Sequence, residues 1–331
     1  MADKKKHLIL IHGRSTKPSE AAKRRMVTRA LTHGLDRADP SGAAAKAIEE
    51  GKVKFSFVYY GDIANQRMLE KDRSLKRRLT ATDPKHKTPC EPAERYKKPL
   101  DALLAQPRHT KAAYEALLDE VRDRRWMDEA AAAISWVASL TGLSDDVIRR
   151  ATADMGAYLM ERRVGSAIRQ RLQRPLAKAL KDGDDVCLVS HSMGCIVSYD
   201  VLWKFSQMSE YQDIQASGNR VALWLTLGNP LGEPGVRRNL YDADEREDGR
   251  FPREIVDRWL NISARDDFVA HDAQIADDFR EMKQMKYLRE IKDLDEVYTF
   301  WVGEHGTNPH KLYGYLDNPV VARQILRWMT R

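Results

Sequence analysis

The chain has only three cysteines among its 331 residues, namely Cys90, Cys187 and Cys195. So few thiols cannot form a disulfide framework, and their spacing does not match a zinc site. This scarcity indicates a reducing compartment. We expect neither a structural metal nor a cofactor.

Long apolar runs are also missing. The apolar stretch nearest the N-terminus is Leu8–Ile11, bounded by His7 and His12, and it is too short for the hydrophobic region of a signal peptide. No segment approaches the ~18 apolar residues that are needed to span a bilayer. Together with the few cysteines, this predicts a cytoplasmic protein.

The sequence contains no phosphate-binding glycine loop, dinucleotide-binding fingerprint or internal repeat. It does have a basic charge balance, with 56 Lys and Arg against 49 Asp and Glu and a formal net charge of +7. A basic surface can attract nucleic acid or phospholipid head groups. Charge is the only feature that supports nucleic-acid binding, so we expect no such partner. Peripheral contact with a membrane stays open.

Short apolar runs rich in β-branched residues alternate with longer helical patterns. The helical patterns are Ser19–Leu35, Arg162–Lys181 and Gly194–Met208. This alternation predicts an α/β fold whose sheet is mainly parallel, with about six strands and helices on both faces. The predicted strands are His7–Ile11, Val53–Tyr60, Asp185–Ser190, Val221–Leu227, Trp259–Ser263 and Val297–Val302.

The interval from Ile63 to Gly183 has no convincing strand. Residues 64–125 hold 16 Lys and Arg against 10 Asp and Glu. Four prolines predict a loop over Thr82–Pro99, and apolar residues at helical spacing predict a helix over Trp126–Thr141. We therefore expect a helical cap inserted into the sheet domain. The predicted division is 1–62 for the first part of the core, 63–165 for the cap and 166–331 for the second part.

The strongest functional signal is the segment Ser190-His191-Ser192-Met193-Gly194, which lies between a predicted strand and an apolar helix. This is the context of a nucleophile elbow, in which a tight turn holds an exposed serine hydroxyl above the sheet. The positions two before and two after the serine must be small. Gly194 meets this requirement, while Ser190 stands where glycine is usual. The N–H of Met193, at the helix N-terminus, is a predicted oxyanion donor.

This elbow, together with the early strand that ends in His12-Gly13, resembles α/β-hydrolases of the lipase and esterase type. The resemblance covers the strand-rich parts of the chain. It implies a second oxyanion donor in the turn after the first strand, the N–H of Arg14. It also implies that His12 is a structural residue of that turn and that the triad follows the chain order serine, acid, histidine.

The acid is expected just beyond a strand that follows Ser192. The segment after the strand Trp259–Ser263 contains Asp266 and Asp267. Asp267-Phe268-Val269 is similar to the Asp-Pro-Val turn of the family, with Phe in place of Pro. We therefore favour Asp267 and keep Asp266 as the alternative.

The base must be one of nine histidines. Chain order excludes those before the elbow, the His191 side chain should point away from Ser192, and His271 is too close to the acid. His305 and His310 then remain. The segment that begins at His310 is similar to the histidine loop of such lipases, so His310 is preferred and His305 is the alternative.

These residues predict a serine hydrolase that cleaves a carboxylic ester through an acyl-enzyme. The expected substrate is a small-molecule or lipid ester. The alternative is a catalytically silent protein of the same fold that binds or signals, because fold alone does not guarantee activity. Ser190 and the doubled aspartates are the features that favour this alternative. The sequence carries no signal for an oligomeric state.

Overall fold

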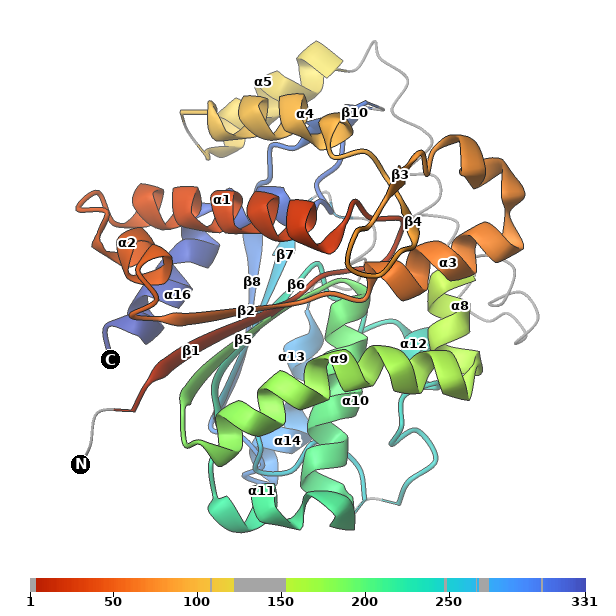
Figure 1. Cartoon of the computed structure of the whole chain (residues 1–331). Coiled ribbons are helices and arrows are strands. Elements are labelled where there is room, and N and C mark those ends of the chain that lie inside the picture. Colours follow the sequence, from red (N-terminus) through yellow and green to blue (C-terminus); the bar gives the residue numbers. More distant parts are fainter. Residues whose placement is uncertain are drawn as a thin grey trace.

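The computed structural model describes residues 4–107, 109–121, 153–246, 249–265, 267, 274–304 and 306–331. Its centre is a six-stranded sheet in the order β2-β1-β5-β6-β7-β8, and every pairing in it is parallel (Figure 1). The predicted α/β fold with about six parallel strands is confirmed. The strands are β1 (Lys6–Ile11), β2 (Lys54–Val58), β5 (Asp185–His191), β6 (Val221–Leu227), β7 (Arg258–Ala264) and β8 (Glu290–Val297).

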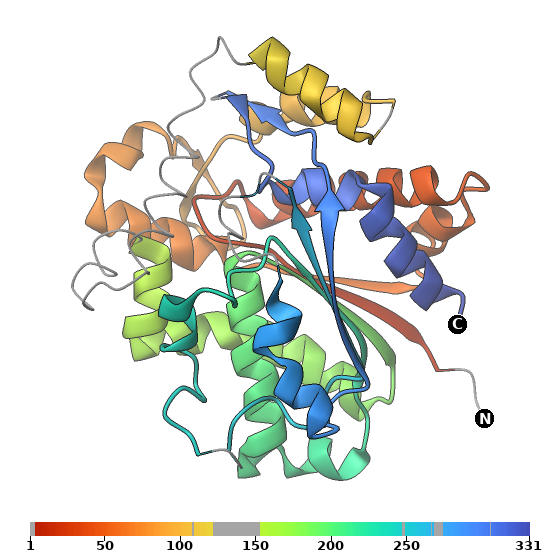
Figure 2. The ribbon, with the colours of Figure 1, turned by 180° about the vertical axis from the view of Figure 1, so that it is seen from behind.

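Helices cover both faces of the sheet, as the views from the front and from behind show (Figures 1 and 2). One face carries α1 (Glu20–Ala38), α2 (Ala43–Glu49), α15 (Leu312–Asp317) and α16 (Pro319–Met329). The other face carries α9 (Arg162–Lys181), α10 (Met193–Gln207), α11 (Gln212–Ser217), α13 (Ile275–Asp278) and α14 (Arg280–Gln284).

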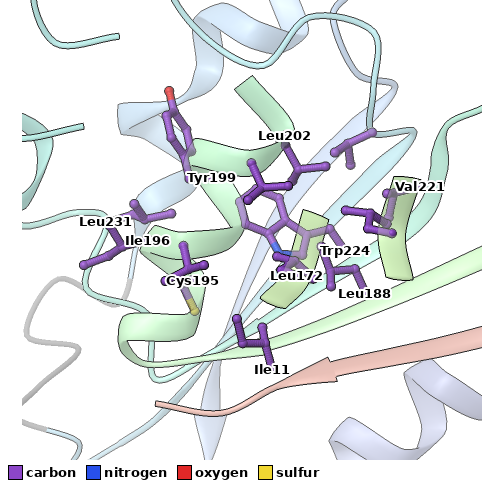
Figure 3. Close-up of a cluster of buried hydrophobic side chains, with 14 of the residues drawn as sticks. Ile11, Leu172, Leu188, Cys195, Ile196, Tyr199, Leu202, Val221, Trp224 and Leu231 are labelled. Carbon is purple, nitrogen blue, oxygen red and sulfur yellow. The ribbon is translucent and has the colours of Figure 1, made fainter. Parts of the chain in front are cut away.

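The inner strands are apolar on both sides because each of their faces packs on a helix layer. In β1, Leu8 and Leu10 belong to one buried cluster, and Ile9 and Ile11 belong to the other. Figure 3 shows the second cluster, where the side chains of α10 meet the sheet around Trp224. Trp224 also stacks on Trp259 of the next strand, with 4.3 Å between ring centroids.

The other described elements lie mostly in the connections. Across all the residues that the structure describes, no helix is both long enough and apolar enough to cross a bilayer. Short 3-10 turns lie at Arg73–Arg77 and Ser209–Tyr211. The remaining elements are α3 (Gly61–Lys71), β3 (Ala81–Thr82), β4 (Pro89–Cys90), α4 (Glu94–Leu104), α5 (Lys111–Val121), α8 (Ala153–Met160), α12 (Pro234–Arg237), β9 (Val302–Gly303) and β10 (Gly306–Thr307).

The prediction for the last strand is wrong. The strand β8 spans Glu290–Val297, whereas the apolar run Val297–Val302 forms no strand until the short β9. The strand β8 lies at the edge of the sheet and exposes several polar side chains, so it lacks the apolar pattern that marks the inner strands. In the apolar run, Phe300 and Trp301 are buried by helix packing instead.

The predicted loop at Thr82–Pro99 is also partly wrong. The strands β3 and β4 pair antiparallel within the interval that was expected to have no strand, and α4 begins at Glu94 with Pro99 inside it. Proline removes one helical hydrogen bond, but the buried side chains of Tyr96, Leu100 and Leu103 hold this helix in place. The predicted helix Trp126–Thr141 lies outside the described residues, and the three-part division of the chain stays a prediction.

Gly34 marks the close crossing of α1 over α15. A Cβ atom at this position would lie 2.0 Å from the carbonyl oxygen of Leu316. Glycine to alanine in an open helix normally stabilises by about 0.5–1 kcal/mol, but here we expect Gly34→Ala to lower the free energy of unfolding by about 1–3 kcal/mol through overpacking. Urea unfolding measures this, with Arg25→Ala on the exposed side of the same helix as the control. A variant as stable as the parent would contradict the expectation.

Asp200 on α10 is a buried carboxyl group that accepts a hydrogen bond from Tyr158 of α8 and lies 3.8 Å from Arg169 of α9. Burial raises its pKa from 3.8 to about 6, against the Tyr158 hydrogen bond and the Arg169 charge, which lower it. Since the folded protein then holds a proton that the unfolded chain releases, the free energy of unfolding should rise as pH falls through 6.

The expected gain between about pH 7.5 and about pH 5 is about 1 kcal/mol from this group. Asp200→Asn removes the titration, so the unfolding free energy of the parent minus that of the variant should increase as the pH is lowered. Urea titrations at both pH values test this. Identical pH dependence in the two proteins would show that Asp200 keeps an ordinary pKa in the fold.

Candidate active site

Ser192 occupies a sharp turn between β5 and α10, with φ 54° and ψ −128°. A non-glycine residue in this region costs about 1–3 kcal/mol, and such strain is characteristic of functional sites. The turn is held by two backbone hydrogen bonds, from Ser192 N to Leu227 O at 3.0 Å and from Cys195 N to Ser192 O at 2.7 Å. The backbone therefore has the strand–turn–helix form that the sequence predicted.

Small residues surround the turn because the backbone segments approach closely. A Cβ atom on Gly194 would lie 2.8 Å from the carbonyl oxygen of His12 and 3.0 Å from that of Ile11. A Cβ atom on Gly13 would lie 2.6 Å from the Cβ of Ser192. The turn after β1 is thus packed directly on the serine.

Ser190 has a structural reason to replace the usual glycine. Its hydroxyl accepts a hydrogen bond from the indole Nε1 of Trp224 at 3.0 Å and pairs with the hydroxyl of Ser198 at 2.7 Å. These contacts tie β5 to β6 and to α10 beneath the turn. The departure from glycine therefore satisfies a buried indole and does not loosen the turn.

The predicted acid and base are in contact. His310 Nδ1 lies 2.8 Å and 2.9 Å from the two carboxylate oxygens of Asp267, whose side chain is fully buried. Nδ1–H donates to this carboxylate, which leaves Nε2 free of the proton in the neutral ring. The alternatives Asp266 and His305 lie outside the described residues.

Sequence reasoning missed Tyr315, which completes this pair. Its hydroxyl donates to Asp267 Oδ2 at 2.6 Å and accepts from the N–H of Ala264 at 2.7 Å. Burial and the Asp267 charge raise the pKa of Tyr315, so it stays a donor. Its position five residues after His310 gave no signal, because the contact joins residues 48 apart in the chain.

The segment Leu227–Gly228 contacts both the serine and the histidine. Ser192 N donates to Leu227 O, and a Cβ atom on Gly228 would lie 2.9 Å from His310 Nδ1 and 2.7 Å from Asp267 Oδ2. Ser192 and the His310–Asp267 pair therefore meet at the same two residues. Within the described structure, Ser192 Oγ and His310 Nε2 are both buried and neither has a hydrogen-bond partner.

The predicted exposure of the serine hydroxyl is wrong. Ser192 is only 1% exposed, because the turn after β1 packs on it through Gly13. In this state a substrate carbonyl could not reach Oγ without a shift of the surrounding groups. The hydrogen bond between Ser192 and His310 is also not formed, and such bonds often tighten only when substrate binds.

His191 contacts the histidine loop. Its Nε2 donates to the carbonyl oxygen of His310 at 2.7 Å, and the two rings are 4.8 Å apart at their centroids. Burial, with the neighbouring charge of His310, lowers the pKa of His191 well below its usual value, so its ring is neutral. His191 therefore positions the backbone that carries His310.

His12 makes the contacts of a structural residue. Its Nδ1 donates to the carbonyl oxygen of Gly13 at 2.7 Å, its Nε2 accepts from Tyr60 N at 3.2 Å, and its ring stacks on Tyr60. Burial, with the charge of Lys17, lowers its pKa well below the usual value. Its two ring nitrogens thus tie the turn after β1 to the segment after β2.

The two predicted oxyanion donors belong to the two segments that meet at the serine. Met193 follows Ser192 directly and opens α10, where the first N–H groups have no partner inside the helix. Arg14 directly follows Gly13, which packs on Ser192. Developing negative charge between these two amides would also be favoured by the positive end of the α10 dipole.

Among the described residues, no three His, Cys, Asp or Glu side chains are arranged to hold a metal ion. Comparisons of the chain with protein-family models, with curated proteins and with solved structures find no match. The functional assignment therefore depends on the geometry of the site alone.

Proposed function

We propose that the chain is a serine hydrolase that resembles α/β-hydrolases and cleaves a carboxylic ester. The observation that carries this proposal is the strained turn at Ser192 beside the buried His310–Asp267 pair. Backbone strain of this kind persists only where the surrounding structure maintains it. An ordinary strand-to-helix connection needs neither the strain nor a histidine paired with a buried carboxylate.

The proposed reaction begins with attack of Ser192 Oγ on the ester carbonyl while His310 Nε2 takes the hydroxyl proton. Asp267 stabilises the imidazolium, and the N–H groups of Met193 and Arg14 hold the oxyanion. The C–O bond then breaks, and the leaving alkoxide receives the proton from His310. Water attacks the acyl-enzyme with the same base, which releases the acid and restores the serine.

A catalytically silent protein of the same fold is the second candidate. It is favoured by the burial of the Ser192 hydroxyl and by the missing hydrogen bond to His310. Under this alternative the turn would be a retained structural feature.

A fluorophosphonate probe separates the two candidates, because it reacts covalently only with an activated serine. We expect labelling of the folded protein at Ser192 by peptide mapping, with no labelling in Ser192→Ala. Ser74→Ala, at an exposed position outside the site, is the control and should be labelled like the parent. A folded protein that resists the probe would favour the silent protein. A panel of short- and long-chain esters then tests whether the substrate is a small-molecule or a lipid ester.

A further inference from the structure

Lys23 in the first turns of α1 is a buried lysine that has no acidic partner among the residues that the structure describes. The residue is only 4% exposed, and its Nζ lies 4.0 Å from the centroid of the Tyr313 ring. In the described part of the chain, Nζ makes no hydrogen bond and no ion pair. A buried ammonium group costs several kcal/mol unless it is paired, and a tyrosine ring offsets only part of this cost.

The charges around Lys23 are mostly of the same sign. Burial, and then the charges of Lys17 and Lys311, lower the pKa of Lys23 well below its usual value. Lys17 and Lys311 therefore make the unpaired ammonium still less favourable. We call Lys17, Lys23 and Lys311 the basic cluster.

The charge of Glu91 raises the pKa of Lys23. The Glu91 carboxylate, however, already has other partners. It accepts hydrogen bonds from the hydroxyls of Thr16 and Tyr96, and it lies 2.9 Å from the guanidinium of Arg78. Glu91 is also buried, at 2% exposure. Its negative charge is thus shared with Arg78 and is not available to Lys23 alone.

The basic cluster adjoins the candidate active site. Lys311 directly follows His310, and its Nζ lies 5.3 Å from the ring of Tyr96. Lys17 and Lys23 are close enough that their charges lower the pKa of His191, whose ring contacts the backbone of His310. Positive charge therefore gathers beside the segment that carries His310.

We propose that the basic cluster binds an anionic group, a carboxylate or a phosphate, carried by the ester substrate. An anion beside Lys23 supplies the missing partner of the buried ammonium, and charge-assisted hydrogen bonds of this kind are strong. This inference rests on the proposed hydrolase function and narrows its substrate to esters with a negative charge near the scissile carbonyl. Lys23 is the residue that distinguishes such esters from neutral ones.

The first test compares two esters with five-carbon acyl groups, mono(4-nitrophenyl) glutarate and 4-nitrophenyl valerate. The measured quantity is the ratio of their kcat/KM values. Lys23→Met should lower the ratio of anionic to neutral ester by about 10–100-fold, the effect of losing one hydrogen bond to a charged group. Lys178→Met, which removes a surface lysine far from the site, should leave the ratio unchanged. An unchanged ratio in folded Lys23→Met would overturn the inference.

The second test uses binding instead of turnover. Calorimetry of the Ser192→Ala protein with glutarate and with inorganic phosphate should show binding of at least one anion, and the tighter of the two identifies the chemical source. Adding Lys23→Met to Ser192→Ala should weaken this binding by about 10–100-fold. If the Lys23→Met variant does not fold, Lys311→Met is used in its place. This substitution should also weaken anion binding.

These tests separate the two proposals. Absence of probe labelling at Ser192, together with anion binding that depends on Lys23, would reject the hydrolase and keep the anion site. Labelling at Ser192, together with no anion preference and no anion binding, would keep the hydrolase and reject the anion site.

Discussion

Replacing Ser192 by alanine should lower kcat for an activated ester by about 10⁴–10⁶-fold, the range expected when the nucleophile of a serine–histidine–aspartate site is removed. The loss is large because His310 and Asp267 act only through the serine hydroxyl. Once Oγ is gone, their contact at 2.8 Å activates nothing. The residual rate would come from binding and from the two oxyanion donors alone.

The measurement is the release of 4-nitrophenol under saturating ester, with circular dichroism to confirm that the variant is folded. Ser206→Ala is the matched control, since it removes a hydroxyl near the far end of the same helix, where the hydroxyl bonds to Trp203 O and to Arg253 N. It should keep turnover within about threefold of the parent. Equal activity of Ser192→Ala and the parent would exclude Ser192 as the nucleophile.

The turn at Ser192 could be predicted from the sequence because all its determinants are neighbours in the chain. An apolar strand, two small flanking residues and an apolar helix lie within Asp185–Gln207. The pairing of His310 with Asp267 could not be predicted from neighbouring residues. It was predicted from the chain order that the resemblance to α/β-hydrolases implies. That order selects segments, and the structure then supplies the contact across 43 residues.

Other parts of the site could not be predicted because they depend on contacts between distant segments. Tyr315 reaches Asp267 and His191 reaches the backbone of His310 through such contacts, and neither residue type carries a local pattern. The burial of Ser192 likewise comes from Gly13, which is brought over the turn only when β1 and β5 pair. The last strand was predicted at the wrong residues, because β8 is an edge strand with polar side chains and lacks an alternating apolar pattern.

Asp267→Asn is expected to lower kcat by about 10⁴-fold while the fold is kept, because the asparagine would hold His310 in the wrong tautomer. In the parent, the carboxylate accepts from His310 Nδ1–H and from the hydroxyl of Tyr315. An amide has one oxygen and one NH₂ group in place of the two oxygens. Because the Tyr315 hydroxyl donates at this site, the amide oxygen is expected to face it.

The NH₂ group of the asparagine would then face His310 Nδ1, and this nitrogen would have to accept a hydrogen bond. The ring proton moves to Nε2, where it blocks removal of the proton from Ser192. The pH dependence of kcat/KM for Asp267→Asn and for Tyr315→Phe checks this argument. Tyr315→Phe keeps the carboxylate and loses one neutral donor, so its loss should be about tenfold. Turnover of Asp267→Asn within tenfold of the parent would contradict the assignment of Asp267 and transfer the role to Asp266.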